Sequence, residues 1–262
     1  MKWPNSLTLI RHAESAYNVL RAQKEASPLY QKFRAAFERD SYSSECIELA
    51  HQIKGAFSLG VSDYNTPLTD EGVRQARETG RKLSRHIPCP HVVFVSPYER
   101  TKQTFNLMAL EWPALRDAKL VLDDRLREQE HGLSTLYNDW RVFHTLYPDQ
   151  KEYQNRNPYW YQYPQGESVS EVRERDRSFT NMLIREHAGD DVLEVTHHLT
   201  ILSKRANQER LSPEEFLYLD EHEKPVNCGV TLYRGNPKVG KDGRLELEFY
   251  NKQLWTKAQE EK

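Results

Sequence analysis

Hydrophobic positions fall in short runs separated by longer amphipathic stretches, the pattern of strands that alternate with helices. Four runs are apolar enough to predict strands: residues 6–10 (SLTLI), which look buried, 91–95 (HVVFV), 119–122 (KLVL) and 191–196 (DVLEVT). Two later segments, 228–234 and 244–250, alternate apolar and polar residues around a stretch rich in Gly, Asn, Pro and Lys, and so predict a hairpin.

The stretches between the strands carry apolar residues at helical spacing. The clearest begins at Thr69, an N-cap with acidic residues in the first turn, and its inner face would hold Val73, Ala76, Gly80 and Leu83. Ser168 and Glu171 match a capping box for a helix that ends near His187. Further helices are predicted in the charged region up to Asp40 and over residues 98–110, 199–208 and 212–219.

Two regions have a weaker pattern. Residues 41–62 look less regular than the helical region before them, and residues 130–165 indicate a helix plus an irregular excursion with aromatic residues at Tyr159–Tyr163. Aromatic side chains supply apolar area with polar tips, so the excursion suits a packed loop and a substrate lid equally well. We expect the long stretch between Asn18 and Ser62, together with the excursion over residues 137–165, to flank the mouth of a binding pocket.

Strands that alternate with helices are typical of the α/β class, in which a mainly parallel sheet is covered by helices on both faces. We therefore expect a single three-layer α/β/α domain over residues 1–262. Residues 19–62 and 133–166 would form insertions, or a lid, over the active-site edge of the sheet.

Composition narrows the classes of partner. The formal net charge is −2 and the mean hydropathy is −0.85, so any anion-binding site must be local, and we expect no nucleic-acid partner. Three widely spaced cysteines argue against a disulfide framework or a zinc ribbon. The sequence shows no signal-peptide pattern and no apolar run of the ~20 residues needed to cross a bilayer. We expect a cytoplasmic protein with no membrane partner.

Charged side chains follow the ends of the predicted parallel strands. In open α/β sheets, ligands bind beyond the carboxyl ends of the strands, so these positions would share one edge. In chain order, the four strands are followed by Arg11–His12, Arg100, Glu128 and His197–His198. Histidines, arginines and a carboxylate therefore converge.

These residue types together suit phosphoryl chemistry. Arginine offers a planar, charged fork that matches phosphate oxygens. A neutral imidazole attacks phosphorus near neutral pH and forms a covalent intermediate. A nearby carboxylic acid can protonate the leaving alkoxide and then act as base towards water. This chemistry needs neither a metal nor another cofactor.

Six blocks carry a resemblance to a known family. The segment LTLIRHAESAYN resembles the RHG signature of the histidine phosphatase superfamily, which includes the cofactor-dependent phosphoglycerate mutases. The likeness continues, in the family's order, through NTPLTDEGVRQA, VSPYERTKQT, LREQEHG, QGESVSEVRER and VTHHLTI, and so samples the chain from Leu7 to about Leu202. It implies a phosphoglycerate mutase-like fold and a phosphohistidine intermediate.

The resemblance also implies roles for individual residues. His12 would be the nucleophile and Glu128 the general acid and base, while Arg11, Arg100 and His197 would bind the phosphate oxygens. Three more positions would line the phosphate or substrate site: Ser15, Asn18 and His198. Ser15 and Asn18 also suit caps or turns, and Asp123 and Asp124 are alternatives to Glu128 as the acid.

The sequence departs from the family pattern at three positions. Ala13 replaces the signature glycine, and His198 replaces the glycine that commonly follows the second histidine. In the mutases, the acid-bearing block resembles ERHYG, and its arginine helps to hold a carboxylated substrate. Gln129 stands at that arginine's position here, so the block is more similar to that of the family's phosphatases. We expect hydrolysis of a small phosphorylated metabolite.

Other interpretations stay open. A mutase-type phosphotransferase would use the same nucleophile, and a non-catalytic phospho-ligand or protein-binding module would keep the fold. A metal at His197–His198 is not expected, because adjacent side chains point in different directions and no ligand set accompanies them. The sequence leaves the natural substrate, the pathway and the oligomeric state undetermined.

Overall fold

The computed structural model describes residues 2–137 and 139–257. The predicted domain also includes residues 1, 138 and 258–262, which lie outside the described residues; residue 138 belongs to the predicted insertion 133–166. Contacts divide the chain into two compact units. Unit 1 comprises Met1–Ser15, Asp63–Glu128 and Arg173–Lys262, and unit 2 comprises Ala16–Ser62 and Gln129–Val172. The segments of unit 2 nearly coincide with the two predicted insertions.

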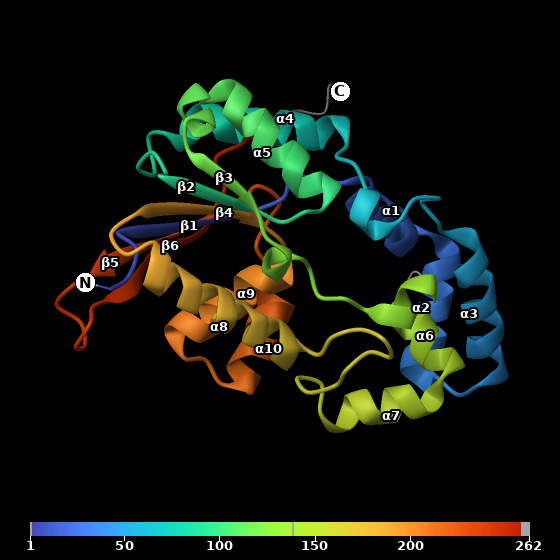
Figure 1. Ribbon diagram of the computed structural model, residues 1–262. Helices are drawn as coiled ribbons and strands as arrows, with labels where there is room; N and C mark the ends of the chain where they lie inside the picture. Colours follow the sequence, from blue (N-terminus) through green and yellow to red (C-terminus); the bar gives the residue numbers. More distant parts are fainter. Residues whose placement is uncertain (1, 138, 258–262) are drawn as a thin grey trace. The chain divides into compact units, whose positions relative to one another are not determined.

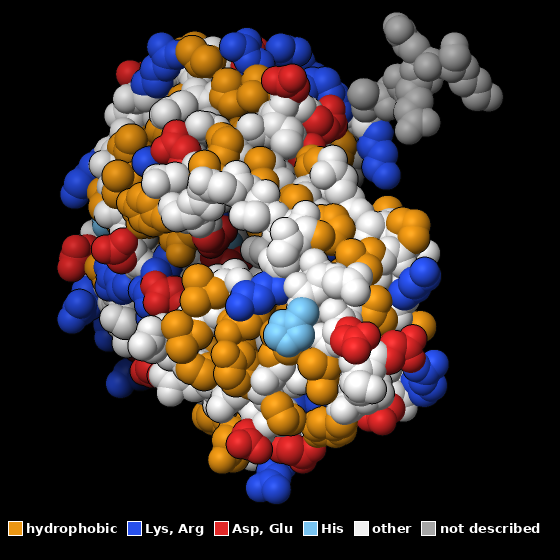
Figure 2. All heavy atoms as spheres, turned by 90° about the vertical axis from the view of Figure 1, so that its right-hand side faces the viewer, with side chains coloured by type: hydrophobic (Ala, Val, Ile, Leu, Met, Phe, Trp, Pro, Cys, Tyr) orange, Lys and Arg blue, Asp and Glu red, His pale blue; other side chains and the backbone are white. Residues whose placement is uncertain are grey.

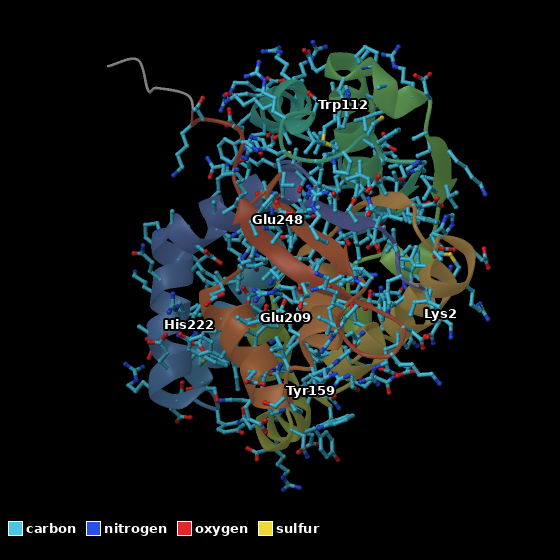
Figure 3. All side chains as sticks on the ribbon, turned by 90° about the vertical axis from the view of Figure 1, so that its left-hand side faces the viewer. Lys2, Trp112, Tyr159, Glu209, His222 and Glu248 are labelled. Carbon is cyan, nitrogen blue, oxygen red and sulfur yellow. The ribbon has the colours of Figure 1, made fainter. Side chains whose placement is uncertain are left out.

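A six-stranded sheet of order β3-β2-β4-β1-β5-β6 forms the centre of unit 1 (Figure 1). The parallel strands are β1 (Ser6–Arg11), β2 (Val92–Val95), β3 (Lys119–Leu122) and β4 (Asp191–Thr196). An antiparallel hairpin, β5 (Val230–Asn236) and β6 (Arg244–Lys252), adds to β1; it faces the viewer in Figure 3, where Glu248 on β6 is labelled. The predicted strands and hairpin are confirmed.

Helices cover both faces of this sheet. One face carries α4 (Asp70–Leu83) and α5 (Glu99–Glu111), and the other carries α8 (Val169–Glu186) and α9 (His198–Glu209) (Figure 1). Successive strand residues alternate between the two cores. Ile10 packs in the α4–α5 core with Met108, whereas Leu9 packs in the other core with Phe179. The α/β class and its three layers are confirmed.

Helices α4 and α8 begin where the capping residues predict. The Thr69 hydroxyl accepts a hydrogen bond from the Gly72 N–H at 3.0 Å, and Ser168 and Glu171 exchange the bonds of a capping box at 2.7 and 3.2 Å. Gly72 has a second function, because a Cβ there would lie 2.0 Å from the Glu14 carbonyl oxygen. Glycine therefore lets α4 approach the loop after β1. The last helix of the unit, α10 (Pro213–His222), has its own capping box at Ser212 and Glu215.

A buried ion triad joins β4 to α8 and α9. The Lys204 ammonium lies 2.6 Å from Asp176 and 3.2 Å from Glu194, and all three side chains are buried. Burial raises the pKa of Glu194 to about 7, although the ammonium opposes this shift. Removing one partner of such a group leaves a buried charge uncompensated, so the triad fixes the strand that leads to His197.

Unit 2 is helical and contains a helix that the sequence did not predict. Its helices are α1 (Ala16–Ala26), α2 (Pro28–Asp40), α3 (Ser44–Ala56), α6 (Trp140–Leu146) and α7 (Pro148–Arg156). The expectation of a less regular segment over 41–62 is wrong for α3, and 130–165 holds two α-helices instead of one. The buried face of α3 consists of Cys46, Ala50 and Ile53, two of them small residues that give a weak hydrophobic period.

The aromatic excursion packs inside unit 2. Tyr161 and Tyr163 are buried in one core cluster with Tyr30 and Phe33 of α2, which supports the packed-loop interpretation. A buried ion pair between Lys24 and Asp139, at 2.6 Å, lies beside this cluster. The role of unit 2 as a lid stays a prediction. No helix in the described ranges is long and apolar enough to span a bilayer.

Candidate active site

The carboxyl ends of three parallel strands meet at one edge of the sheet in unit 1. The His12 N–H donates to the Thr196 carbonyl at 2.9 Å, and the Ser96 N–H donates to the Val195 carbonyl at 3.0 Å. The residues that follow β1, β2 and β4 are thus adjacent along the edge. This is the convergence that the sequence predicts.

The imidazole of His12 is held by the backbone of the next residue, Ala13. Its Nδ1 lies 2.7 Å from the Ala13 carbonyl oxygen, and the side chain is buried, with 4% of the residue exposed. A carbonyl can only accept, so Nδ1 carries the proton and Nε2 of the neutral ring keeps its lone pair. The loop is fixed in turn, because Thr104 accepts from the Ala13 N–H at 3.0 Å and Asn227 donates to the His12 carbonyl at 3.0 Å.

The second histidine, His197, is fully buried beside the first. The two ring centroids lie 5.3 Å apart, and the Tyr98 ring meets His197 edge-on at 4.9 Å. The Nε2 atom of His197 lies 2.8 Å from the Ser96 hydroxyl, whereas Nδ1 has no hydrogen-bond partner among the described residues. Ser96 was not singled out from the sequence, although its position directly after β2 was a usable signal.

Burial and positive charge keep both imidazoles neutral. Burial lowers the pKa of His12 and of His197 well below 6.5, and the nearby guanidinium groups of Arg100 and Arg11 lower both further. A protonated imidazole has no lone pair for attack, so this environment maintains the nucleophilic form at neutral pH.

The lowered pKa values predict that both histidine rings stay neutral over a pH range that NMR can follow. As pH falls from 8 to 6, the ring signals of His12 and His197 should keep their neutral chemical shifts, because both pKa values lie below this window. Spectra of the His12→Ala and His197→Ala variants would assign the signals. A midpoint between pH 6 and pH 8 for either ring would contradict this account of the site's electrostatics.

Two arginines reach the same edge. Arg11 ends β1, and its Nη1 donates to the Pro225 carbonyl at 2.7 Å. Arg100 lies in the first turn of α5, and its side chain is 5% exposed. Its Nη1 donates to both the backbone oxygen and the carboxylate of Asp63, at 2.7 and 2.9 Å. Asp63 was not predicted, because nothing in its sequence context indicates a partner 37 positions away.

Glu128 lies at the N-terminus of α9. Its carboxylate accepts from the Leu199 N–H at 3.1 Å, two residues after His197, and its backbone oxygen accepts from Arg175 at 3.1 Å. The residue before it is tied to the same helix, since Thr200 donates to the Arg127 carbonyl at 2.7 Å. These bonds place the candidate acid beside the histidine edge.

The alternative acids have other surroundings. Asp123 receives hydrogen bonds from the Arg125 guanidinium at 2.9 and 2.6 Å. Burial raises the pKa of Asp123, but the bonds from Arg125 outweigh this and leave it below its usual value. An acid with a lowered pKa is a poor proton donor at neutral pH. Asp124 is exposed and begins the 3₁₀ turn Asp124–Leu126.

The remaining predicted site residues are distributed over both units. Ser15 is buried in unit 1 and forms an isolated β-bridge with Leu68, whereas Asn18 lies on α1 of unit 2. The Nε2 atom of His198 lies 2.8 Å from a carboxylate oxygen of Asp220 on α10. Contacts of Ser15, Asn18 and His198 with a substrate stay predictions.

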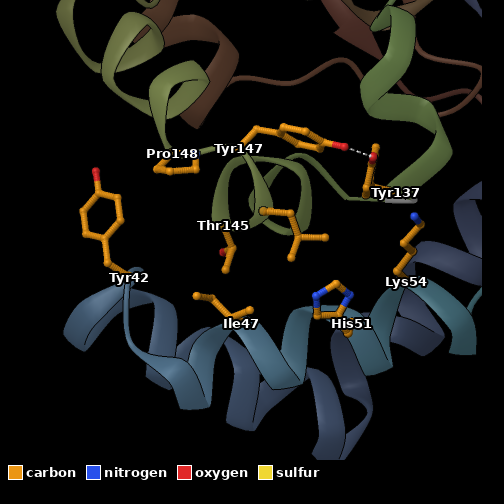
Figure 4. A pocket seen from close by; sticks show the side chains of 9 residues that line it. Tyr42, Ile47, His51, Lys54, Tyr137, Thr145, Tyr147 and Pro148 are labelled. Atoms are coloured by element: carbon orange, nitrogen blue, oxygen red, sulfur yellow. Dashed lines mark hydrogen bonds between the residues drawn. The ribbon is translucent and has the colours of Figure 1, made fainter.

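A cavity of about 500 Å³ lies elsewhere, between α3 and α6–α7 of unit 2 (Figure 4). In the close-up, the hydroxyl groups of Tyr137 and Tyr147 form a hydrogen bond of 2.7 Å above His51 and Lys54. Figure 2 shows hydrophobic side chains gathered beside a histidine on the side of the molecule that carries α3. None of the predicted site residues lines this cavity. Within the described chain, no group of three or more His, Cys, Asp or Glu side chains could hold a metal ion.

Comparisons with known proteins all point to one family. The model of the histidine phosphatase superfamily, branch 1, matches residues 59–239. The phosphoglycerate mutase-like protein AT74H of Arabidopsis thaliana is 31% identical over 50% of this chain and 48% of its own. Phosphoserine phosphatase 1 of Hydrogenobacter thermophilus is 28% identical over 50% of this chain and 58% of its own. The chain thus spans about half the length of the curated relatives it matches.

Solved structures agree on the fold. Mycobacterial glucosyl-3-phosphoglycerate phosphatase, solved with inorganic phosphate, is 17% identical, with a TM-score of 0.59 over 95% of this chain and 98% of its own. At this identity the likeness concerns the fold alone, and the phosphoglycerate mutase-like architecture expected from the sequence is confirmed. The family model matches residues 59–239, a range that includes Arg100 of α5 and His197. The chain therefore belongs to branch 1 of the histidine phosphatase superfamily.

Proposed function

We propose that the protein hydrolyses phosphomonoesters without a metal, through a covalent phosphohistidine on His12 and with Glu128 as general acid and base. The observation that carries this proposal is the bond from Nδ1 of His12 to the Ala13 carbonyl, which leaves Nε2 as the nucleophilic nitrogen of a neutral, buried ring. The superfamily's phosphatase-named members support phosphoryl chemistry in general.

In the first step, Nε2 of His12 attacks phosphorus, a P–N bond forms and the bond from phosphorus to the leaving oxygen breaks. The carboxylic acid of Glu128 gives its proton to that oxygen. Arg11 and Arg100 stabilise the charge that spreads over the phosphoryl oxygens, and His197 offers its Nδ1 to one of them. The Ser96 hydroxyl keeps the His197 ring in place.

In the second step, water attacks the phosphoryl group, the Glu128 carboxylate takes a proton from this water, and the P–N bond breaks. Inorganic phosphate leaves, His12 returns to its neutral state, and Glu128 returns to its acid form. Protons and charges balance over the cycle, so no co-reactant other than water is needed.

Gln129 favours water over a second substrate as acceptor. In a mutase, a cation at this position holds a carboxylated substrate between two transfers, and Gln129 supplies no charge. Its amide donates instead to the Glu167 carbonyl at 2.8 Å within unit 2. Transfer to an acceptor is the second candidate, and stimulation by a bisphosphorylated sugar acid would support it.

Phosphate release tests the proposal. A panel of small phosphomonoesters, including phosphorylated amino acids and sugar acids, should release phosphate at the same rate with and without EDTA. These classes match the names of the similar phosphatases. Loss of activity in EDTA that is restored by a divalent cation, or no release from any ester, would contradict metal-independent hydrolysis.

A further inference from the structure

The surroundings of Arg100 contain a carboxylate that the proposed reaction does not use. Asp63 begins the 3₁₀ turn η1 (Asp63–Asn65), and its side chain is 48% exposed while that of Arg100 is 5% exposed. An exposed aspartate gains little from an ion pair by itself. The buried arginine, in contrast, needs a counterion and acceptors for its protons.

The hydrogen bonds from Asp63 surround Nη1, at the end of the guanidinium group. Both protons of Nη1 are used, one by the Asp63 backbone oxygen at 2.7 Å and one by Oδ1 at 2.9 Å. The other carboxylate oxygen, Oδ2, lies 3.4 Å from Nη2. Asp63 therefore sits on the edge formed by Nη1 and Nη2.

The adjacent edge, formed by Nε and Nη2, stays available. Arginine has five N–H donors in a rigid plane, and the edge formed by Nε and Nη2 also offers two parallel donors. Within the described residues, no hydrogen bond is made by Nε of Arg100. This is the edge that could bind two oxygens of a phosphoryl group while Asp63 keeps its own bonds.

Aromatic rings fix the plane of the same group. The Cζ atom of Arg100 lies 4.7 Å from the centroid of the Tyr98 ring, and Tyr64, the residue after Asp63, packs on Tyr98 at 5.1 Å. Tyr98 also contacts His197, so Tyr64 of the turn, Arg100 and His197 all pack against the same aromatic ring. The segment that follows the turn is anchored to α5, because the Gln103 side chain accepts from the Leu68 N–H at 2.9 Å.

We propose that Asp63 is a positioning residue, which holds Arg100 by its Nη1–Nη2 edge so that the Nε–Nη2 edge faces the phosphoryl group. The inference rests on the proposed function, because it assigns Arg100 to the phosphate. Two properties of Asp63 act in opposite directions. Its hydrogen bonds orient the guanidinium group and so strengthen phosphate binding, whereas its negative charge repels the phosphate.

Two substitutions separate these properties. Asp63→Ala removes the carboxylate bonds, and the dissociation constant of inorganic phosphate should rise roughly 5- to 20-fold, the effect of a lost charge-assisted hydrogen bond. Asp63→Asn keeps an oxygen that can accept from Nη1 but removes the charge. Its dissociation constant should equal that of the wild type or fall below it.

Calorimetric titration of the full chain with inorganic phosphate, in EDTA, measures binding without turnover. Asp242→Ala is the matched control, since Asp242 is also about half exposed and paired with a cation, Lys2, at 3.2 Å, but lies on the β5–β6 turn. It should bind phosphate like the wild type. In an Arg100→Ala background, Asp63→Ala should cause no further loss of affinity, because the orienting effect of Asp63 acts through Arg100 and only the repulsion by its charge is left to remove.

The outcomes are distinct. Unchanged or tighter binding by Asp63→Ala, or an equal loss with and without Arg100, overturns the positioning role alone. If Asp63→Ala does not fold, weaker binding by Asp63→Asn overturns it. A wild-type chain that binds no phosphate contradicts the proposed function, and the inference fails with it.

Discussion

The His12→Ala variant is expected to release phosphate from a good phosphomonoester substrate no faster than the uncatalysed background. Alanine cannot form the P–N bond, and a second imidazole cannot replace it, because His197 is fixed by the bond from its Nε2 to Ser96. The buried arginines would still bind the phosphoryl group. Phosphate binding should therefore persist while kcat falls to background, which separates a lost nucleophile from a lost site.

His222→Ala is a suitable control for this variant. His222 is an exposed histidine on α10, also in unit 1, and its ring stacks on Tyr218. Its loss should leave kcat unchanged, and circular dichroism should show both variants folded. Wild-type turnover in folded His12→Ala would exclude this residue as the nucleophile.

The Glu128→Ala variant should lose about 10²–10⁴-fold in kcat, the usual contribution of a general acid or base. The loss should be greatest for alkyl phosphates, whose poor leaving groups need a proton, and least for p-nitrophenyl phosphate, whose phenolate leaves unaided. For the aryl ester, the second step should become limiting, because no base activates the water.

Asp124→Ala is the matched control, since Asp124 is an exposed carboxylate in the same loop. It should keep wild-type rates for both esters. Equal losses for alkyl and aryl esters in Glu128→Ala would remove the acid role from Glu128, and an alkyl-selective loss in Asp124→Ala would transfer that role to Asp124.

The sequence predicted the sheet and the edge that carries the chemistry because both depend on local signals. Buried parallel strands are short apolar runs, and β4 has the predicted bounds Asp191–Thr196. The residues at the carboxyl ends of parallel strands share one edge of the sheet, so the sequence alone groups Arg11, His12 and His197.

The sequence could not supply features that depend on small residues or on distant partners. Helix α3 escaped prediction because its buried face carries Cys46 and Ala50, whose contribution to a hydrophobic period is small. In the sequence, Asp63 has the features of an ordinary polar turn residue, and only the fold shows that it binds Arg100. Likewise, only the fold reveals that Ser96 meets Nε2 of His197, and so selects Nδ1 as the free nitrogen.

The most direct test of the central claim is to identify the phosphorylated residue. Glu128→Ala should accumulate the covalent intermediate with p-nitrophenyl phosphate, and a quench in base preserves phosphohistidine. Trypsin cleaves after Arg11 and Arg21, and the resulting peptide, residues 12–21, contains no other histidine. Mass spectrometry should find one phosphoryl group on this peptide, at His12. Continued phosphate release with no phosphoryl group on His12, or with the group on another residue, would contradict the mechanism.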